Sequence, residues 1–506
     1  TAVHVNQTSN TENNGAFIFG RLGLDYFVSN KTTLSAGVVR VHGEMKPGET
    51  LDIYTDSIFN GAKSNATYSQ RISNTNRVFN ATGVQLGLKH NFSKAGENIS
   101  ADLNSFSGHN SSDAFYTTNY YNAVNTINGT QLQKVIGDGT NKFLTVQTDY
   151  ENSLSKKTKL EAGARVQINK LTNNNFTYLQ PVGASDFTLV SNATTNYKNT
   201  NQVYAAYASI SSSIKDFGYK IGLRAESSSY DGELTNTKEK FSNSYPISLF
   251  PSVFLSQKLS NKQQVQASFT RRINRPNFFQ LIPYTDYTDS LNITRGNPNL
   301  LPEFTNSFEV SYSKTFTGNN TFLASLYYKH TNNLITRFLQ EDINPVSGKT
   351  DLINTYINAN SSYAYGAEFT STNAVAKWWD LTTNINLYKS KINTDNITGT
   401  SQDALLSWFG KFNSNFKLPK NFTIQLSADY QSKTNLPVTS NQGFGGSPGM
   451  GGGAQSSSQG YIKSFWGTDI AIKKTFLKNN AASVTLNVSD IFRTRYSRQV
   501  SQSPYF

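Results

Sequence analysis

Apolar and polar residues alternate along many short segments of this chain. Between Asn421 and Tyr430 the sequence reads NFTIQLSADY, and every second residue is apolar. The apolar positions are Phe422, Ile424, Leu426, Ala428 and Tyr430. A period of two is that of a β-strand with one apolar face and one polar face. The same alternation recurs at 159–168, 219–226, 380–388 and 482–489. The pattern therefore predicts a long series of strands.

Charged residues lie on the polar faces of these predicted strands. The candidates are Lys159, Glu161, Arg165, Lys220, Arg224 and Glu226. In a soluble sandwich such a face meets solvent, whereas in a wide barrel it lines a hydrated lumen. Alternation alone leaves both interpretations open. In a barrel, these six residues are expected to face the lumen. The residues expected to touch lipid are Leu160, Val166, Ile221, Leu223, Ile385, Leu426 and Leu486.

The composition favours the barrel. The chain has 506 residues, too many for one β-sandwich, and only 37% of them are hydrophobic. Mean hydropathy is −0.48, and no apolar run approaches the ~18 residues of a membrane helix. Aromatic residues make up 13% of the chain. Several stand at predicted strand ends, where rings can bridge lipid and headgroups: Tyr26, Phe27, Phe92, Tyr150, Trp378, Trp379 and Phe476.

Short and long connections alternate along the chain. Short polar turns, most of them with a lysine, are predicted at 29–32, 93–96, 155–158, 215–218, 260–262, 317–320, 419–421 and 478–480, with a ninth near 374–377. The stretches predicted as long loops are 44–77, 107–140, 170–200, 231–245, 273–303, 333–352 and 433–460. Short periplasmic turns and long extracellular loops are typical of outer-membrane barrels. The predicted fold class is all-β: a large antiparallel transmembrane β-barrel of about 18 strands, and of 20 to 22 when complete.

We expect residues 1–506 to form one barrel domain within a longer polypeptide. Thr1 is not followed by a signal peptide, and no clear alternating strand follows Phe492. An N-terminal region and a final strand are therefore expected outside the chain. The glycine-rich segment 443–453 is predicted to be a solvated loop tip or a flexible extracellular flap.

Other features narrow the class of protein. The absence of cysteine suits an exported bacterial chain and excludes disulfides and thiolate metal sites. The net charge of +13 comes from scattered Lys and Arg, so no nucleic-acid partner is predicted. The five histidines form no His pair with metal-ligand spacing. Asp25, Asp149, Asp380, Asp429 and Asp469 stand singly on predicted strands. We predict no enzyme, no metal and no cofactor.

One region carries a more specific signal. It contains Arg272-Ile273-Asn274-Arg275-Pro276 and, further on, Gly296-Asn297-Pro298-Asn299-Leu300-Leu301-Pro302-Glu303. This region resembles the TonB-dependent receptor-like outer-membrane β-barrels common in Bacteroidetes-type bacteria. The prolines prevent strand pairing in the loop, and Glu303 starts the next strand. We interpret Arg275, Pro276, Gly296, Asn297, Pro298, Pro302 and Glu303 as structural motif residues.

The resemblance implies a function and a set of partners. It implies a receptor in the outer membrane of a Gram-negative bacterium that takes up a large ligand, such as a chelate, an oligosaccharide or a peptide. Implied partners are outer-membrane lipid and lipopolysaccharide, TonB through an N-terminal region with a plug, and a surface lipoprotein or other complex subunits. The alternative is a non-transporting barrel subunit or scaffold of an outer-membrane secretion or protein-assembly complex.

Overall fold

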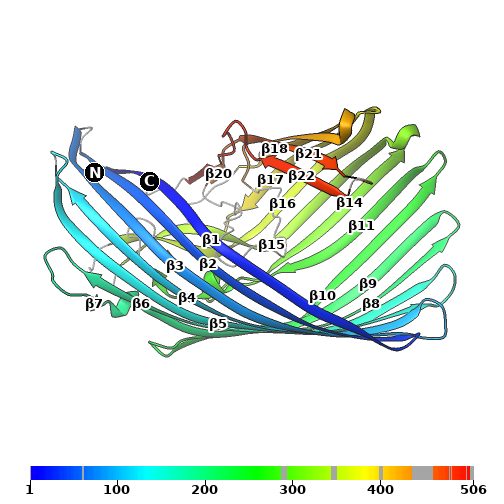
Figure 1. Cartoon of the computed structure of the whole chain (residues 1–506), viewed down its shortest axis with the longest axis horizontal. Coiled ribbons are helices and arrows are strands. Elements are labelled where there is room, and N and C mark those ends of the chain that lie inside the picture. Colours follow the sequence, from blue (N-terminus) through cyan, green and yellow to red (C-terminus); the bar gives the residue numbers. More distant parts are fainter. Residues whose placement is uncertain are drawn as a thin grey trace.

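The chain forms one large curled β-sheet (Figure 1). The computed structural model describes residues 2–59, 62–122, 124–286, 293–343, 350–397, 403–435, 460–477, 479, 481–496 and 498–501. The long strands are β1 (Ala2–Ser29), β2 (Thr32–Phe59), β3 (Ala62–Asn91), β4 (Glu97–Tyr121), β5 (Ile127–Ser153), β6 (Lys159–Gln180), β8 (Thr195–Ile214), β9 (Phe217–Leu234), β10 (Glu239–Leu259), β11 (Gln263–Asn274), β14 (Glu303–Thr315), β15 (Thr321–Ile343), β16 (Thr350–Ala376), β17 (Trp379–Asn393), β18 (Leu405–Leu418), β19 (Phe422–Gln431), β21 (Phe465–Phe476) and β22 (Ala482–Val488).

The remaining elements are short. They are β7 (Thr188–Leu189), β12 (Thr285–Asp286), β13 (Ile293–Arg295), β20 (Gly460–Ile462), β23 (Gln499–Ser501), helix α1 (Phe278–Leu281), and three 3₁₀ turns, Ser191–Ala193, Thr317–Asn319 and Pro419–Asn421. No helix of the described residues has the length and apolar character needed to cross a membrane.

Each long strand pairs antiparallel with the next long strand in the chain. The main sheet has 21 strands, and three of them, β7, β12 and β13, are short. The other 18 confirm the predicted number of strands and the all-β fold class. Strands β20 and β23 form a separate two-stranded sheet. Within the described residues, no pairing joins β22 to β1.

The tight turns gather at one end of the sheet and the long hairpins at the other (Figure 1). Hairpin turns occur at all nine predicted places, although Lys478 and Asn480 lie outside the described residues. Several turn residues have positive φ, among them Asn261 at 58° and Lys262 at 57°. Two successive left-handed residues match the right-handed twist of the flanking strands.

Several stretches predicted as long loops are instead paired strand. Most of the described residues within 44–77 lie in the distal part of the β2–β3 hairpin, and most of those within 107–140 lie in the distal part of the β4–β5 hairpin. Much of 170–200 lies in β6 and β8. Beyond the membrane both faces of a hairpin meet water, so the apolar–polar alternation that reveals a strand is lost there. The predicted boundaries of these loops were therefore wrong. The segment 443–453 lies outside the described residues.

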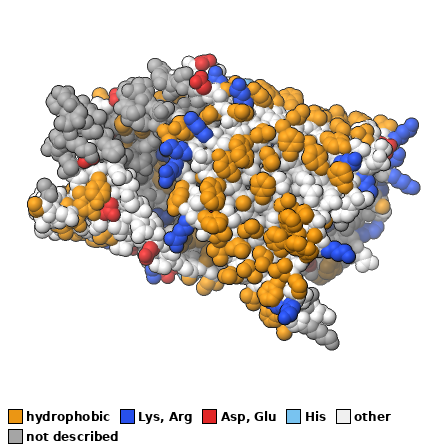
Figure 2. Space-filling model, turned by 90° about the horizontal axis from the view of Figure 1, so that it is seen from above, with side chains coloured by type: hydrophobic (Ala, Val, Ile, Leu, Met, Phe, Trp, Pro, Cys, Tyr) orange, Lys and Arg blue, Asp and Glu red, His pale blue; other side chains and the backbone are white. Residues whose placement is uncertain are grey.

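Apolar side chains on one face of the sheet line up from strand to strand. One row runs through Leu24, Ala36, Leu86, Leu103, Val146, Val166 and Tyr204. Adjacent residues on this face, such as Leu223 and Leu486, are 49% and 60% exposed. Figure 2 shows hydrophobic side chains spread as a broad band, with Lys and Arg mainly along its margins. An outward apolar band is what a membrane-spanning barrel presents to lipid.

The β-sheet does not enclose a hydrophobic core like that of a compact soluble protein. The chain exposes 29871 Å², whereas a compact soluble protein of 56.1 kDa would expose about 18,000 Å². The aromatic residues predicted to form a girdle lie at the tight-turn end, where Trp378, Trp379 and Phe416 stack with ring centroids about 6 Å apart. The large exposed area means that much of the sheet is not packed against other parts of the chain.

Candidate functional site on the inner wall

The first group of polar side chains on the inner wall surrounds Glu161. Its carboxylate forms ion pairs with Lys220 and with Lys159, whose Nζ lies 3.0 Å away. It also accepts a hydrogen bond from Ser209 Oγ at 3.0 Å. Lys159 also contacts Glu151 at 3.0 Å. Strands β6, β8 and β9 pair side by side here and bring these residues together. Three of the six predicted lumen residues therefore form one network.

The second group surrounds Glu226, whose side chain is only 9% exposed. Arg224, two positions before it on β9, lies 2.5 Å away. Arg275, just after β11, donates to the other carboxylate oxygen and also to Ser228 Oγ at 3.0 Å. A carboxylate so far from water requires charged donors. Arg275 therefore joins the start of the motif region to the wall.

Replacing Glu226 by alanine is expected to cost roughly 2–3 kcal/mol of stability. Removing one partner of a fully buried ion pair costs about 3–5 kcal/mol, and the two arginines here retain some contact with water. The control is Glu233→Ala, which removes a less buried pair with Lys198, in which the glutamate is 21% exposed, and should cost under about 1 kcal/mol. Urea unfolding in detergent, followed by heat-modifiable gel migration, measures both. Equal losses of stability in the two variants would contradict the conclusion that the buried Glu226 ion pairs stabilise the protein more than the Glu233 pair does.

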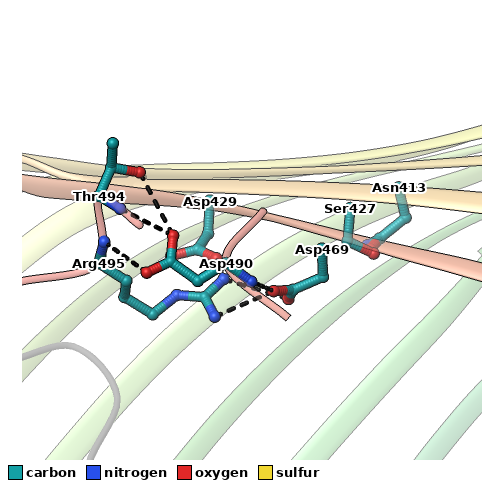
Figure 3. Close-up of polar contacts among 7 residues, drawn as sticks. All are labelled: Asn413, Ser427, Asp429, Asp469, Asp490, Thr494 and Arg495. Atoms are coloured by element: carbon teal, nitrogen blue, oxygen red, sulfur yellow. Dashed lines mark hydrogen bonds and ion pairs between the residues drawn. The ribbon is translucent and has the colours of Figure 1, made fainter. Parts of the chain in front are cut away.

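The third group is formed by the chain after β22. Arg495 contacts Asp429 on β19 at 2.6 Å and Asp469 on β21 at 3.1 Å (Figure 3). Asp490 accepts the backbone N–H groups of Thr494 and Arg495, which hold the pKa of its carboxyl below the usual value. A Cβ at Gly467 would meet Arg495 Nε at 2.4 Å. The segment after β22 is thus fastened onto the polar face of β19 and β21.

The motif region between β11 and β14 folds back onto the inner wall. Asn243 Nδ2 on β10 donates to the Pro298 carbonyl at 2.6 Å, and Asn297 Nδ2 donates to the Tyr356 carbonyl on β16 at 3.0 Å. Asn358 both accepts from the backbone N–H of Leu301 and donates to its carbonyl. The region is therefore bonded to strands that precede it and to strands that follow it.

The packing of this region is apolar. Leu281 of α1 and Leu300 of the motif are buried with Tyr230 of β9 and Ile335 of β15. Burial raises the pKa of the Tyr230 hydroxyl. A second small cluster joins Tyr197, Leu234 and Ile282. Tyr197 lies seven residues from Tyr204 of the apolar row on β8, toward the long-hairpin end.

The motif residues have individual contacts. A Cβ on Gly296 would approach the Ile282 carbonyl oxygen to 2.4 Å, so only glycine fits against α1. Pro276 and Pro302 are buried. The Glu303 carboxylate accepts hydrogen bonds from Asn274 Nδ2 at 2.7 Å and from the Ile335 N–H at 2.6 Å. Nearby, Arg295 contacts Asp342 at 2.6 Å and holds the pKa of its carboxyl below the usual value.

The structure divides the six predicted lumen residues into two networks and leaves one apart. Lys159, Glu161 and Lys220 form the first network, and Arg224 and Glu226 belong to the second. Arg165 lies apart from both and donates to Gln167 at 2.9 Å. That the six residues face a water-filled lumen stays a prediction. Glu151 and Arg495 were not among the predicted lumen residues, because only the folded structure shows that their partners Lys159 and Asp469 lie beside them.

The arrangement suits binding rather than bond-making chemistry. No group of three or more His, Asp or Glu side chains suited to a metal ion is found in the part of the chain that the structure describes. The charged groups of the three networks are held by ion pairs and hydrogen bonds. Such a surface presents donors and acceptors to a polar solute without an activated nucleophile.

Comparisons with known proteins agree with this geometry. The model of a family described as the outer membrane protein beta-barrel family matches residues 90–506. A search of curated proteins by sequence found no match.

Solved structures with the same fold were also found. The ferric-catecholate import receptor Fiu of E. coli K12 is 12% identical with a TM-score of 0.53, and the match covers 96% of this chain and 77% of that receptor. The siderophore receptor PiuA of Acinetobacter baumannii is 10% identical with a TM-score of 0.55 and coverages of 99% and 80%. The copper transporter OprC is 10% identical with a TM-score of 0.54 and coverages of 97% and 75%. At these identities the likeness concerns the fold.

Proposed function

The chain belongs to the outer membrane protein β-barrel family, and we propose that it forms the wall of a receptor that takes up a large ligand across the Gram-negative outer membrane. The ligand classes we propose are a metal chelate, an oligosaccharide or a peptide. The observation that carries the proposal is the wide polar inner wall, lined by the Glu161, Glu226 and Arg495 groups. A scaffold that only spans the membrane has no need of such an array inside the sheet.

The structural neighbours support the chelate class first. Two of them are described as a ferric-catecholate import receptor and a siderophore receptor, and another as a copper transporter. None of these descriptions is of an enzyme. The motif region packs against the inner wall through its own apolar cluster. We propose that it narrows the route that the ligand takes through the barrel on the long-hairpin side. Long paired hairpins beyond the apolar band would gather the ligand before it reaches this path.

Partners follow from this function. We propose contacts with outer-membrane lipid and lipopolysaccharide around the wall. We further propose coupling to TonB through an N-terminal region with a plug, outside residues 1–506. A surface lipoprotein or another complex subunit would sit above the long hairpins.

Uptake can be tested by deleting the gene and restoring it on a plasmid. We expect the deletion to abolish uptake of one labelled nutrient among iron-55 catecholate complexes, labelled oligosaccharides and labelled peptides, and the plasmid to restore that uptake. Purification of the native protein in mild detergent, with mass spectrometry of what co-purifies, should then reveal the same ligand class. A deletion that spares every nutrient but causes a general envelope defect, with assembly proteins co-purifying, would replace uptake by the scaffold function.

A further inference from the structure

We propose that the outer face of the wall carries a binding site for phosphate groups of an outer-leaflet lipid headgroup, formed by Lys142 on β5 and Lys170 on β6 with Arg40 of β2 nearby. The chemical class is a phosphorylated glycolipid, of which lipopolysaccharide is the outer-leaflet example. The inference depends on the membrane location of the family and not on ligand uptake.

Strand register places these cations on one row. Lys142 stands directly opposite Lys170, and Arg40 stands opposite Thr82. The full row across β2 to β8 is Arg40, Thr82, Ser107, Lys142, Lys170 and Thr200. Arg40, Lys142 and Lys170 are all exposed. Three exposed cations with hydroxyls between them thus lie on one row of the outward face, and Lys142 and Lys170 are direct neighbours on it.

The Lys142–Lys170 pair lies at the margin of the membrane on the long-hairpin side. On β5 and β6 the two lysines are the next lipid-side residues after Leu144 and Ile168 in the direction of the long hairpins. Leu144 and Ile168 belong to the apolar face. Along β6, the outward positions from Leu160 to Ile168 cover about the 9–11 residues that a transmembrane strand needs, and Lys170 is the next. Tyr150, near the tight turn of the same hairpin, lies at the opposite end. Lys142 and Lys170 are therefore at headgroup depth.

The charges of this row are not neutralised by the protein. Neither Lys142 nor Lys170 has a carboxylate partner among the described residues, and Arg40 donates to Thr82 Oγ1 at 2.6 Å. In the next row toward the long hairpins the charged residues have partners within the protein. His109 contacts Asp138 at 3.2 Å, and Lys198 contacts Glu233 at 3.1 Å. Directly opposed like charges destabilise a strand pair. An external anion between the two lysines would remove that repulsion.

A lipid phosphate fits the position and the chemistry. Ammonium and guanidinium groups bind phosphate oxygens, and basic side chains beside a membrane attract anionic lipid by about 1 kcal/mol each. The apolar row just below would hold the acyl chains of the same lipid.

The test uses the full-length protein purified in detergent, with bisphosphorylated lipid A and chemically dephosphorylated lipid A as probes in native mass spectrometry. We expect the wild type to bind the bisphosphorylated form, and K142Q/K170Q to bind it about tenfold or more weakly. The matched control is K156Q/K157Q, which removes two exposed lysines at the tight turn of the same hairpin and should bind as the wild type does. K142R/K170R keeps both charges and should retain binding.

The outcomes separate binding from folding and from uptake. K142Q/K170Q removes a like-charge pair, so its heat-modifiable migration without lipid should equal that of the wild type. Equal binding by K142Q/K170Q and the wild type would overturn the proposal, and so would equal binding of dephosphorylated lipid A or displacement of lipid A by excess inorganic phosphate. Loss of nutrient uptake plays no part in this readout, so failure of the uptake function would leave the result unchanged.

Discussion

Replacing Leu426 by arginine is expected to destabilise the barrel by about 2–4 kcal/mol, the cost of a cation near the middle of the bilayer on the lipid face. Leu426 is the central outward residue of β19, between Phe422 at the tight turn and Tyr430 at the other end. Tyr430 stacks on Trp408 with a centroid distance of 4.4 Å, so aromatic residues bracket the strand at both interfaces. Urea titration of the protein folded in lipid vesicles, with heat-modifiable migration as the readout, measures the loss.

The neighbouring residue supplies the control. Gln425 is exposed on the polar face of the same strand, and Gln425→Arg adds the same side chain where water can solvate it. We expect that variant to lose less than about 0.5 kcal/mol. Similar losses for the two variants would mean that both faces of the strand have the same surroundings, which is the behaviour of a soluble sheet.

Shortening Leu300 to alanine is expected to cost about 2–5 kcal/mol, the range for removing a large aliphatic side chain from a packed site. Leu300 is 0% exposed and packs on Tyr230, Leu281 and Ile335. The loss should fall on the motif region, because the wall itself is held by strand pairing. Limited proteolysis within 275–302, together with urea titration, would register it.

Leu301 gives the matched variant. It is adjacent, of the same type and 49% exposed, and its hydrogen bonds to Asn358 use only its backbone. Leu301→Ala should therefore change stability by less than about 0.5 kcal/mol and leave the protease pattern unaltered. If Leu301→Ala were as harmful as Leu300→Ala, the cluster around Leu300 would not be what holds the region in place.

Much of the wall could be predicted from the sequence because its physical cause is local. Where one face meets lipid and the other meets water, the period of two is imposed residue by residue, as in Phe422 to Tyr430. Turns were equally visible, since Asn and Lys at positions such as Asn261 and Lys262 tolerate the left-handed backbone that a hairpin requires. These two signals, together with the composition, were sufficient for the fold class and the number of strands.

The rest depends on contacts between residues far apart in sequence. The distal hairpins are wet on both faces, so 44–77 and 107–140 carry no period that distinguishes a strand from a loop. Arg275 and Glu226 each looked like a single charge until folding placed them together. The same holds for Arg495, whose partners Asp429 and Asp469 lie on two other strands. Only the register between strands determines such pairs.

The strand order has a consequence for how the protein assembles. Because each long strand pairs with the next long strand in the chain, most of the wall can grow hairpin by hairpin without closing large chain loops. The region 275–302 is different, since it bonds both to β10, which is made before it, and to β16, which is made after it. It cannot reach its final position until β16 has joined the sheet. The region therefore docks late in assembly, after both β10 and β16 have joined the sheet.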